Sequence, residues 1–196
     1  MERRITPVST VEQSAEINRF IHKDMLLLKG LVYKIYDVKH KSLAQMLVED
    51  VHSGKEQHFG AVNPYKALRD SLSIATQVAI NPNQLYIPDS NLLILDERVA
   101  LIKKINFSLI EEGIEGFKAI MPDVSTLCQL DRMYQEETGE KLIVGLYACA
   151  TTETVGSQVS SVGRIKPNGR LAVISCSRDR DNRNVFVVPV FVPVLK

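Results

Sequence analysis

The stretch NVFVVPVFVPVLK, residues 184–196, decides much of the fold because it is apolar without any alternation. A run this rich in valine predicts either a strand buried on both faces or a strand that waits for a partner chain. Pro189 and Pro193 lie four residues apart, so both missing N–H groups face the same edge of the strand. Because a sheet edge tolerates proline, the pattern favours an apolar edge strand.

The length and composition indicate a soluble globular protein. The 196 residues fit one domain, with a weakly marked boundary near residues 60–64 that would separate an N-terminal β-meander. Lys and Arg number 24 against 23 Asp and Glu, so no overall field directs the chain to nucleic acid or to a membrane. The N-terminus lacks the apolar run of a signal peptide, and no apolar run approaches the ~20 residues of a membrane span. We therefore expect a cytoplasmic protein without membrane contact.

The first third and the last third of the chain carry the strand patterns. A capping box at Ser9 predicts a helix over Thr10–His22. An N-terminal meander of antiparallel strands is then predicted at three runs: Gly30–Val38, Leu43–Val51 and Lys55–Phe59. Three further strands are predicted near the end of the chain: Lys141–Ala150, Arg170–Ser177 and Val185–Leu195.

The middle of the chain has helical spacing. Helices are predicted over Pro64–Ile80, from Asp96 to Gly113 or Gly116, and from Pro122 to about Thr138, where Gly139 would close the last one. Two short strands are predicted at Leu85–Ile87 and Leu92–Leu95. The whole pattern predicts an α+β fold, with antiparallel strands at both ends of the chain and three or four helices between them.

No histidine or cysteine pattern points to a catalytic or metal site. His52 and His58 flank a turn, and either a metal site or two solvated histidines could result. Their spacing matches no zinc motif and favours solvated side chains, so we expect no metal and no cofactor. Cys128, Cys149 and Cys176 are odd in number and widely spaced, which is typical of reduced thiols. The first two fit an ordinary core, and the third lies beside arginines that would lower a thiol pKa.

Two segments could bind a ligand or a partner. Thr151–Gly163 is rich in hydroxyl groups and predicts a polar loop or a twisted polar strand, with backbone amides as its only anion donors. Within twenty residues the chain then gathers six cations: Arg164, Lys166, Arg170, Arg178, Arg180 and Arg183. Three of them fall in the predicted loop Arg178–Asn184, where they would either pair with Asp179 and Asp181 or hold an anion.

Two short resemblances accompany this pattern. Lys29–Phe59 resembles the first barrel of translation elongation factor P, which implies a small β-barrel or meander. The lysine-bearing glycine-rich tip of that family is absent, since Lys39–Ser42 has no glycine. Lys141–Ala150, with its sequence KLIVGLYACA, is similar to a strand of MPN-type domains. The zinc-binding histidines of that family are missing after the strand, so the resemblance implies a metal-free scaffolding relative.

These observations favour a non-catalytic interaction or assembly module that acts through an apolar C-terminal edge strand and an arginine-rich hairpin tip. A protein partner or self-association would follow. The alternative is a regulatory protein that binds an anion, a nucleotide or nucleic acid through residues 151–163 and 178–184. An enzyme that uses scattered carboxylates is a third, weaker hypothesis.

Overall fold

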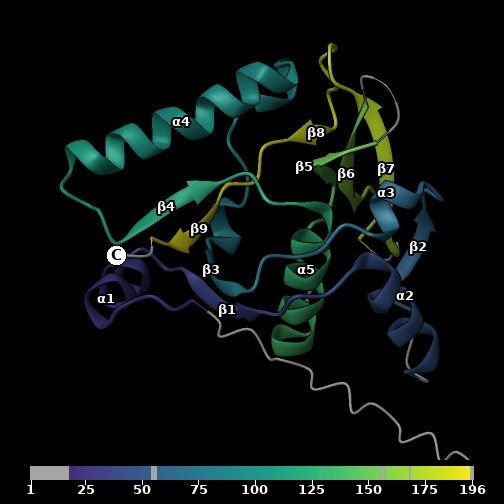
Figure 1. The fold of residues 1–196 in the computed structure, drawn as a ribbon, viewed down its shortest axis with the longest axis horizontal. Helices are drawn as coiled ribbons and strands as arrows, with labels where there is room; N and C mark the ends of the chain where they lie inside the picture. Colours follow the sequence, from purple (N-terminus) through teal and green to yellow (C-terminus); the bar gives the residue numbers. More distant parts are fainter. Residues whose placement is uncertain (1–17, 54–56, 155, 157, 168, 195–196) are drawn as a thin grey trace, which may run out of the picture.

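A computed structural model describes residues 18–53, 57–154, 156, 158–167 and 169–194, and it has the predicted α+β architecture (Figure 1). A four-stranded antiparallel sheet has the order β1 (Lys34–Val38), β3 (Thr76–Ile80), β9 (Val190–Pro193) and β4 (Phe117–Ile120). A five-stranded mixed sheet has the order β2 (Phe59–Val62), β7 (Leu171–Ser177), β6 (Gln158–Arg164), β5 (Leu146–Glu153) and β8 (Val185–Phe186).

Five α-helices and two 3₁₀ turns connect these strands in the described part of the chain. The helices are α1 (His22–Gly30), α2 (Leu43–His52), α3 (Lys66–Arg69), α4 (Leu95–Glu111) and α5 (Val124–Thr138). The 3₁₀ turns are η1 (Pro82–Gln84) and η2 (Ser90–Leu92). The structure confirms the two long predicted helices. Asp123 caps α5 by accepting a hydrogen bond from the Thr126 N–H, and Gly139 ends it at φ 77°.

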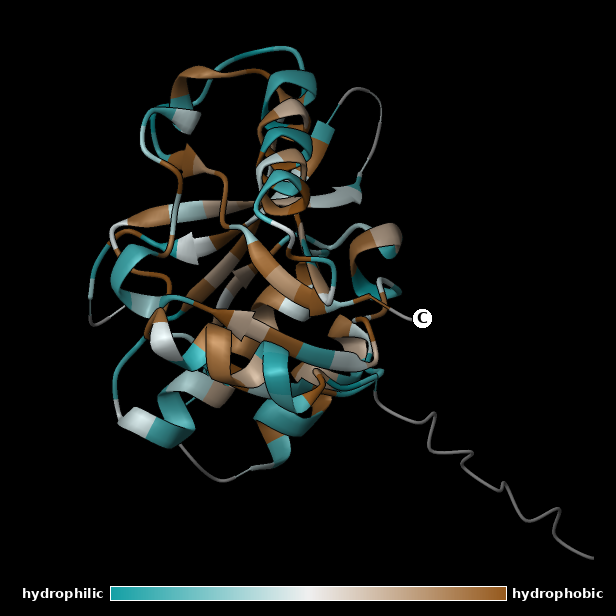
Figure 2. Cartoon of the chain, turned by 90° about the vertical axis from the view of Figure 1, so that its left-hand side faces the viewer, coloured by the Kyte–Doolittle hydropathy of each residue, from teal (hydrophilic) through white to brown (hydrophobic). Residues whose placement is uncertain are grey.

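Two hydrophobic clusters organise the elements. The α5 cluster contains residues of α5 and of both sheets, and Figure 1 places α5 between those sheets. Every residue from Val124 to Asp131 is buried, so the first half of α5 meets protein on all sides. The α4 cluster contains Leu95 and Ile102 of α4 together with strand residues on the sheet faces that point away from α5. Figure 2 shows the apolar residues concentrated in the strands at the centre of the molecule.

The terminal strand β9 belongs to both clusters. Val190 and Val192 lie in the α5 cluster, whereas Phe191 lies in the α4 cluster. This arrangement confirms burial on both faces, but the prediction of an edge strand at β9 is wrong. β9 lies inside its sheet, between β3 and β4, and only the short β8 of the same run forms a sheet edge. Since β3 and β4 are far from β9 in the sequence, its neighbours could not be foreseen from the local pattern.

The two prolines limit how β9 pairs with β3. The Val194 N–H donates to the Gly116 carbonyl at 3.0 Å. Because hydrogen-bonded pairs alternate along antiparallel strands, the backbone N–H and C=O groups of Val192 and Val190 also point toward β4. The alternating residues Pro189, Phe191 and Pro193 therefore face β3, as the sequence spacing predicts. Since two of the three have no N–H, β3 and β9 are paired only at Ala79 and Phe191.

One of the two edges of this sheet, β4, is closed by a side chain. Asn106 of α4 donates to the Ala119 carbonyl at 2.9 Å and accepts from the Ala119 N–H at 2.7 Å. The asparagine amide thus occupies the positions that a neighbouring strand would use. This contact also holds α4 against the sheet and protects β4 from pairing with another chain.

Several local predictions were wrong. Leu43–Val51 is the helix α2 and not a strand, because Ser42 and Gln45 form a capping box at its start. Pro64–Ile80 contains only the short α3, and its end is strand β3, which pairs with β1 along five residues. The short strand predicted at Leu85–Ile87 is irregular backbone, and the one predicted at Leu92–Leu95 runs from the last residue of η2 to the first residue of α4. The helix predicted over Thr10–His22 lies outside the described residues up to residue 17.

The polar segment Thr151–Gly163 is not a loop over most of its described length. Its first residues extend β5, and Gln158–Gly163 belongs to β6, between β5 and β7 in the five-stranded sheet. Ser160 and Ser161 are fully buried, and each hydroxyl has a partner: the Thr152 carbonyl at 2.8 Å and the Cys176 thiol at 3.0 Å. Cross-strand pairing therefore satisfies groups that looked free in the sequence.

Truncating Phe191 to alanine should lower the free energy of unfolding by about 3–5 kcal/mol, since it removes a buried aromatic ring. This ring lies 5.2 Å from Tyr33 and 5.8 Å from Phe117, between centroids. Urea unfolding at neutral pH measures the change. Val194→Ala, at a side chain that is 38% exposed, is the control and should change stability little.

Deleting residues 185–196 should leave the protein unfolded, and a soluble truncated chain with an unchanged melting temperature would contradict this role.

Candidate functional site

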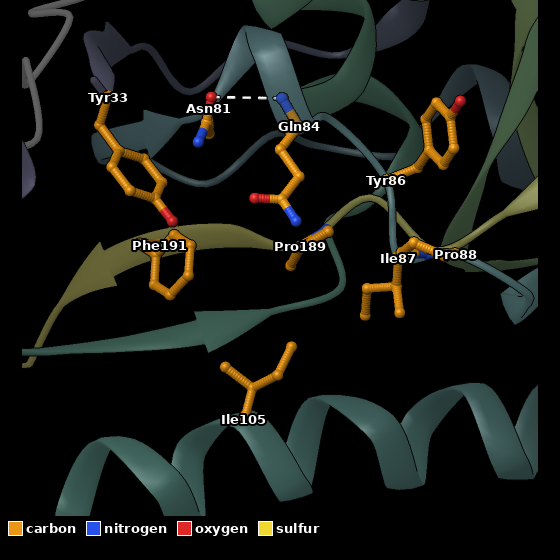
Figure 3. A pocket seen from close by; sticks show the side chains of 9 residues that line it. All are labelled: Tyr33, Asn81, Gln84, Tyr86, Ile87, Pro88, Ile105, Pro189 and Phe191. Carbon is orange, nitrogen blue, oxygen red and sulfur yellow. Dashed lines mark hydrogen bonds between the residues drawn. The ribbon is translucent and has the colours of Figure 1, made fainter. Parts of the chain in front are cut away.

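A cavity of about 210 Å³ lies between η1, β9 and α4 (Figure 3). We name it the tyrosine pocket. It is lined by three aromatic side chains, two prolines, two isoleucines and two amides: Tyr33, Tyr86, Phe191, Pro88, Pro189, Ile87, Ile105, Asn81 and Gln84. None of these side chains carries a formal charge at neutral pH.

The pocket opens where β3 and β9 stop pairing. Ala79 is paired with Phe191 in antiparallel register. Two residues further along, continued pairing of the two strands would place Asn81 opposite Pro189. Pro189 has no N–H to donate, and Asn81 turns away into η1. The two strands therefore separate at this point, and both residues line the space between them.

Tyr33 is placed by an unusual turn at the end of α1. The Tyr33 N–H donates to the Leu28 carbonyl and the Val32 N–H to the Lys29 carbonyl, both at 3.1 Å. This pattern ends a helix with a left-handed residue that is normally glycine, but here it is Val32 at φ 62°. A β-branched residue in this conformation costs about 1–2 kcal/mol. The turn delivers the Tyr33 ring against Phe191, with the ring planes at 88°.

The opposite wall is fixed by η1 and the segment that follows it. The Asn81 Oδ1 accepts hydrogen bonds from the N–H groups of Asn83 at 3.1 Å and Gln84 at 3.3 Å. Tyr86 packs on Phe186 with ring centroids 4.9 Å apart. Asp89, directly after Pro88, is left-handed at φ 60°. Val32 and Asp89 are the two non-glycine residues with positive φ in the described chain, and each adjoins a residue of the pocket. Such backbone is often found at functional sites.

Three polar groups in the pocket have no hydrogen-bond partner among the described residues: the Tyr33 hydroxyl, the Asn81 Nδ2 and the Gln84 side-chain amide. Figure 3 shows the Asn81 oxygen turned toward the Gln84 backbone nitrogen and the Asn81 amide nitrogen turned toward the cavity. Burial raises the pKa of the Tyr33 phenol, so this group stays protonated at neutral pH. The pocket thus offers neutral groups that can still form hydrogen bonds.

An apolar groove continues the pocket along α4. This α4 groove, of about 300 Å³, shares Ile87 and Ile105 with the tyrosine pocket and adds Leu101 and Leu109. Lys104 and Glu112 are the charged residues that line it. Because they share two lining residues, the two spaces adjoin and can be considered as one site.

The six cations predicted as a candidate site do not form one patch. β6 and β7 are antiparallel, so Arg164, Lys166 and Arg170 lie at one end of this hairpin and the loop Arg178–Asn184 at the other. Lys166 and Arg170 are exposed, and Arg170 donates to Gln57. Arg164 is only 2% exposed and cannot contact a partner. This burial has no local sign in the sequence, because the counter-charge of Arg164 lies more than thirty residues away.

The loop Arg178–Asn184 joins β7 to β8, as predicted, and its three arginines differ. Arg178 contacts Asp96 and Glu153, each at 3.1 Å, and Asp96 raises its pKa. Arg180 and Arg183 are exposed and form no ion pair with any described residue. The Leu95 N–H at the start of α4 donates to the Arg178 carbonyl at 3.1 Å, and the Asn182 N–H of the loop donates to the Asn91 carbonyl of η2 at 3.2 Å.

Arg164 belongs to a buried ionic cluster that sequence reasoning missed. Its guanidinium donates two hydrogen bonds to Asp131 of α5, at 2.9 and 2.6 Å. The His58 Nε2 lies 3.1 Å from the same carboxylate, and its Nδ1 lies 3.2 Å from Gln135 Oε1. Burial alone would raise the pKa of Asp131, but hydrogen bonds and positive charge from His58 and Arg164 outweigh it, so the pKa lies below its ordinary value. The prediction of a solvated His58 was wrong, because its side chain is 8% exposed.

The three cysteines are free and buried. Burial raises the pKa of both Cys128 and Cys149, although Arg98 partly opposes the change at Cys149. The Cys176 thiol contacts the Ser161 hydroxyl at 3.0 Å and the Val159 carbonyl at 3.6 Å. Among the residues that the structure describes, no three His, Cys, Asp or Glu side chains gather closely enough to hold a metal ion.

Comparison with known proteins finds no matching family model, no matching curated protein and no matching solved structure. The elongation factor P resemblance is also at odds with the fold, since Lys29–Phe59 contains α2 where a barrel strand was implied. In the described segments, no helix is long and apolar enough to cross a membrane. Function must therefore be inferred from the geometry of the pocket.

Replacing Asp131 by asparagine should destabilise the fold by about 3–5 kcal/mol at neutral pH, because Arg164 would remain buried without its counter-charge. The folded pKa of Asp131 lies below its ordinary value of 3.8, so the carboxylate stabilises the protein above that pH and loses this effect as the pH falls through the folded pKa. The gap in stability between wild type and Asp131→Asn should accordingly shrink in acid.

Urea unfolding over a series of pH values checks this expectation. Asp70→Asn is the control, since Asp70 forms an exposed pair with Lys66 four residues earlier on the chain. This variant should leave stability nearly unchanged. Equal losses in the two variants, or a gap independent of pH, would show that Asp131 is not the anchor of the cluster.

Proposed function

We propose that this chain is a non-catalytic interaction module that binds an extended segment of a partner protein in the tyrosine pocket and the α4 groove. One observation carries the proposal: a concave, uncharged pocket with aromatic and aliphatic walls contains three polar groups without partners among the described residues. Recognition sites typically combine apolar walls with a few well-placed polar groups. The adjoining groove supplies apolar surface for a second side chain of the same segment.

The chemistry of the lining favours binding over catalysis. General acid–base catalysis needs a side chain whose pKa lies near the working pH. The titratable groups that line the tyrosine pocket are the phenols of Tyr33 and Tyr86, and burial raises the pKa of Tyr33 further. The Tyr86 hydroxyl also points away from the cavity in Figure 3. These neutral side chains can orient a ligand without exchanging protons with it.

We expect the partner to bind in a pocket and not along β9 or β4. β9 is enclosed by β3 and β4, and Asn106 closes the outer side of β4. The apolar surface that the sequence offered to a partner is therefore used inside the fold. The space where β9 and β3 separate at Asn81 and Pro189 is, by contrast, hollow and lined by uncharged side chains.

Peptides selected from a random phage-displayed library on the immobilised full chain should depend on the pocket. Tyr86→Ala should weaken their binding by about tenfold or more, because one aromatic wall of the site is removed. Tyr65→Ala is a matched control, since Tyr65 is 38% exposed and Tyr86 is 41% exposed, and Tyr65 does not line the pocket. Fluorescence anisotropy with labelled peptides measures both. A selection that yields no peptide able to distinguish these two variants would refute the proposal.

A second candidate function is binding of an anionic partner by the loop Arg178–Asn184. The observation that favours it is the exposure of Arg180 and Arg183 without ion pairs to described residues, on a loop tied to α4. Arg178 would act mainly as an anchor, because it already contacts two carboxylates. Guanidinium groups presented in this way suit phosphate or carboxylate oxygens.

The double variant Arg180→Gln/Arg183→Gln should bind single-stranded RNA more weakly than the wild type. Its plot of log K against log salt should be shallower by about 0.7 for each phosphate that the variant no longer neutralises. A labelled oligonucleotide of mixed sequence, titrated at several salt concentrations, tests both points. Lys166→Gln/Arg170→Gln removes the same charge at the opposite end of the hairpin and is the control. Identical curves for the two double variants would exclude the loop as a specific anion site.

A further inference from the structure

Each of the three free polar groups of the tyrosine pocket can donate a hydrogen bond to a ligand. Both hydrogen bonds of the Asn81 Oδ1 go to the backbone of η1, so only its Nδ2 remains for a ligand, and this atom can only donate. The Tyr33 hydroxyl is protonated at neutral pH and has no partner among the described residues. The Gln84 amide nitrogen adds a further donor, beside an oxygen that can accept. A ligand with several free acceptors would bind all three groups.

Proline-containing peptide has this property. Each proline lacks its N–H, while all carbonyl groups remain as acceptors. In a left-handed polyproline helix no carbonyl is used internally, so every one can accept a hydrogen bond from a protein. We propose that the tyrosine pocket recognises a proline-containing segment in the polyproline conformation, with its carbonyls bound by Tyr33, Asn81 and Gln84. This inference rests on the interaction function proposed above and names the class of partner.

The walls of the site suit such a ligand. Aromatic side chains form the usual grooves for proline-rich segments because they pack against the flat pyrrolidine ring. Here Tyr33 and Phe191 meet nearly perpendicular, with centroids 5.2 Å apart, and Tyr86 stands at the other end of the cavity. Figure 3 shows the Tyr33 and Gln84 side chains extending from two separate segments toward β9.

The adjoining groove offers a second contact to a polyproline helix. Residues on one face of that helix recur every three positions, about 9 Å apart. Because the α4 groove shares Ile87 and Ile105 with the tyrosine pocket, we place the next residue of the same face in this groove. Val32 and Asp89, the residues with positive φ, directly adjoin Tyr33 and Pro88 of the pocket.

The test uses two labelled peptides on the full chain. One is acetyl-Ala-Pro-Pro-Ala-Pro-Pro-Ala amide, and the other has alanine at every proline, so it keeps the carbonyls but regains the N–H groups and backbone freedom. Fluorescence anisotropy should show the proline peptide binding at least about tenfold more tightly. Gln84→Ala should weaken it by about three- to tenfold, as expected for the removal of one hydrogen bond. Gln57→Ala, at an exposed glutamine outside the pocket, is the control.

The outcomes separate this inference from the function on which it rests. Equal binding of the two peptides, or no binding of the proline peptide while library-selected peptides still require Tyr86, overturns the polyproline inference and leaves the interaction module standing. Proline binding that is unchanged in both Gln84→Ala and Tyr86→Ala also overturns it, because the peptide would then bind elsewhere. Failure of every selected peptide to distinguish Tyr86→Ala from Tyr65→Ala refutes the module itself.

Discussion

Because β9 contributes side chains to both hydrophobic clusters, the helices on its two sides are positioned through one strand. Val190 and Val192 pack toward α5, while Phe191 packs toward α4. A strand buried on both faces needs apolar residues at every position, and this requirement explains why the terminal run shows no alternation. The same burial means that packing in each of the two clusters is weakened if the strand is displaced.

A helix enclosed by protein must also satisfy its polar side chains, and α5 does so through long-range hydrogen bonds. Gln129 donates to the Lys39 carbonyl at 2.7 Å and to the Ser73 hydroxyl at 2.6 Å. Asp131 is bound by Arg164 of β6 and also accepts from the Ile143 N–H at 2.9 Å. These polar interactions fix which sheet faces which side of the helix, whereas apolar packing alone would allow several orientations.

The sequence predicts those elements whose ends and faces are determined locally. Asp123 and Gly139 bound α5, and the prediction was correct there because a cap acts within a few residues. β3 was missed because its strand conformation comes from pairing with β1, about forty positions earlier in the chain. The ionic cluster was missed for the same reason, since Asp131 and Arg164 meet only after α5 packs on β6. The tyrosine pocket combines residues from four segments, and no local motif relates Tyr33 to Gln84 or Phe191.

One local feature of the sequence, the pair of prolines in the terminal strand, nevertheless determines the pocket. The sequence correctly predicts that both prolines face the same side of the strand, but not that this side faces β3. Two prolines on the same side of a strand prevent continuous pairing on that side. At a free edge this would only keep other chains away. Here the side in question faces β3, so pairing is reduced to Ala79 and Phe191, and the strands part at Asn81 and Pro189. The apolar valines keep β9 in the interior while its prolines hold a space open beside it, so the same short segment both supports the fold and creates the cavity in which a ligand would bind.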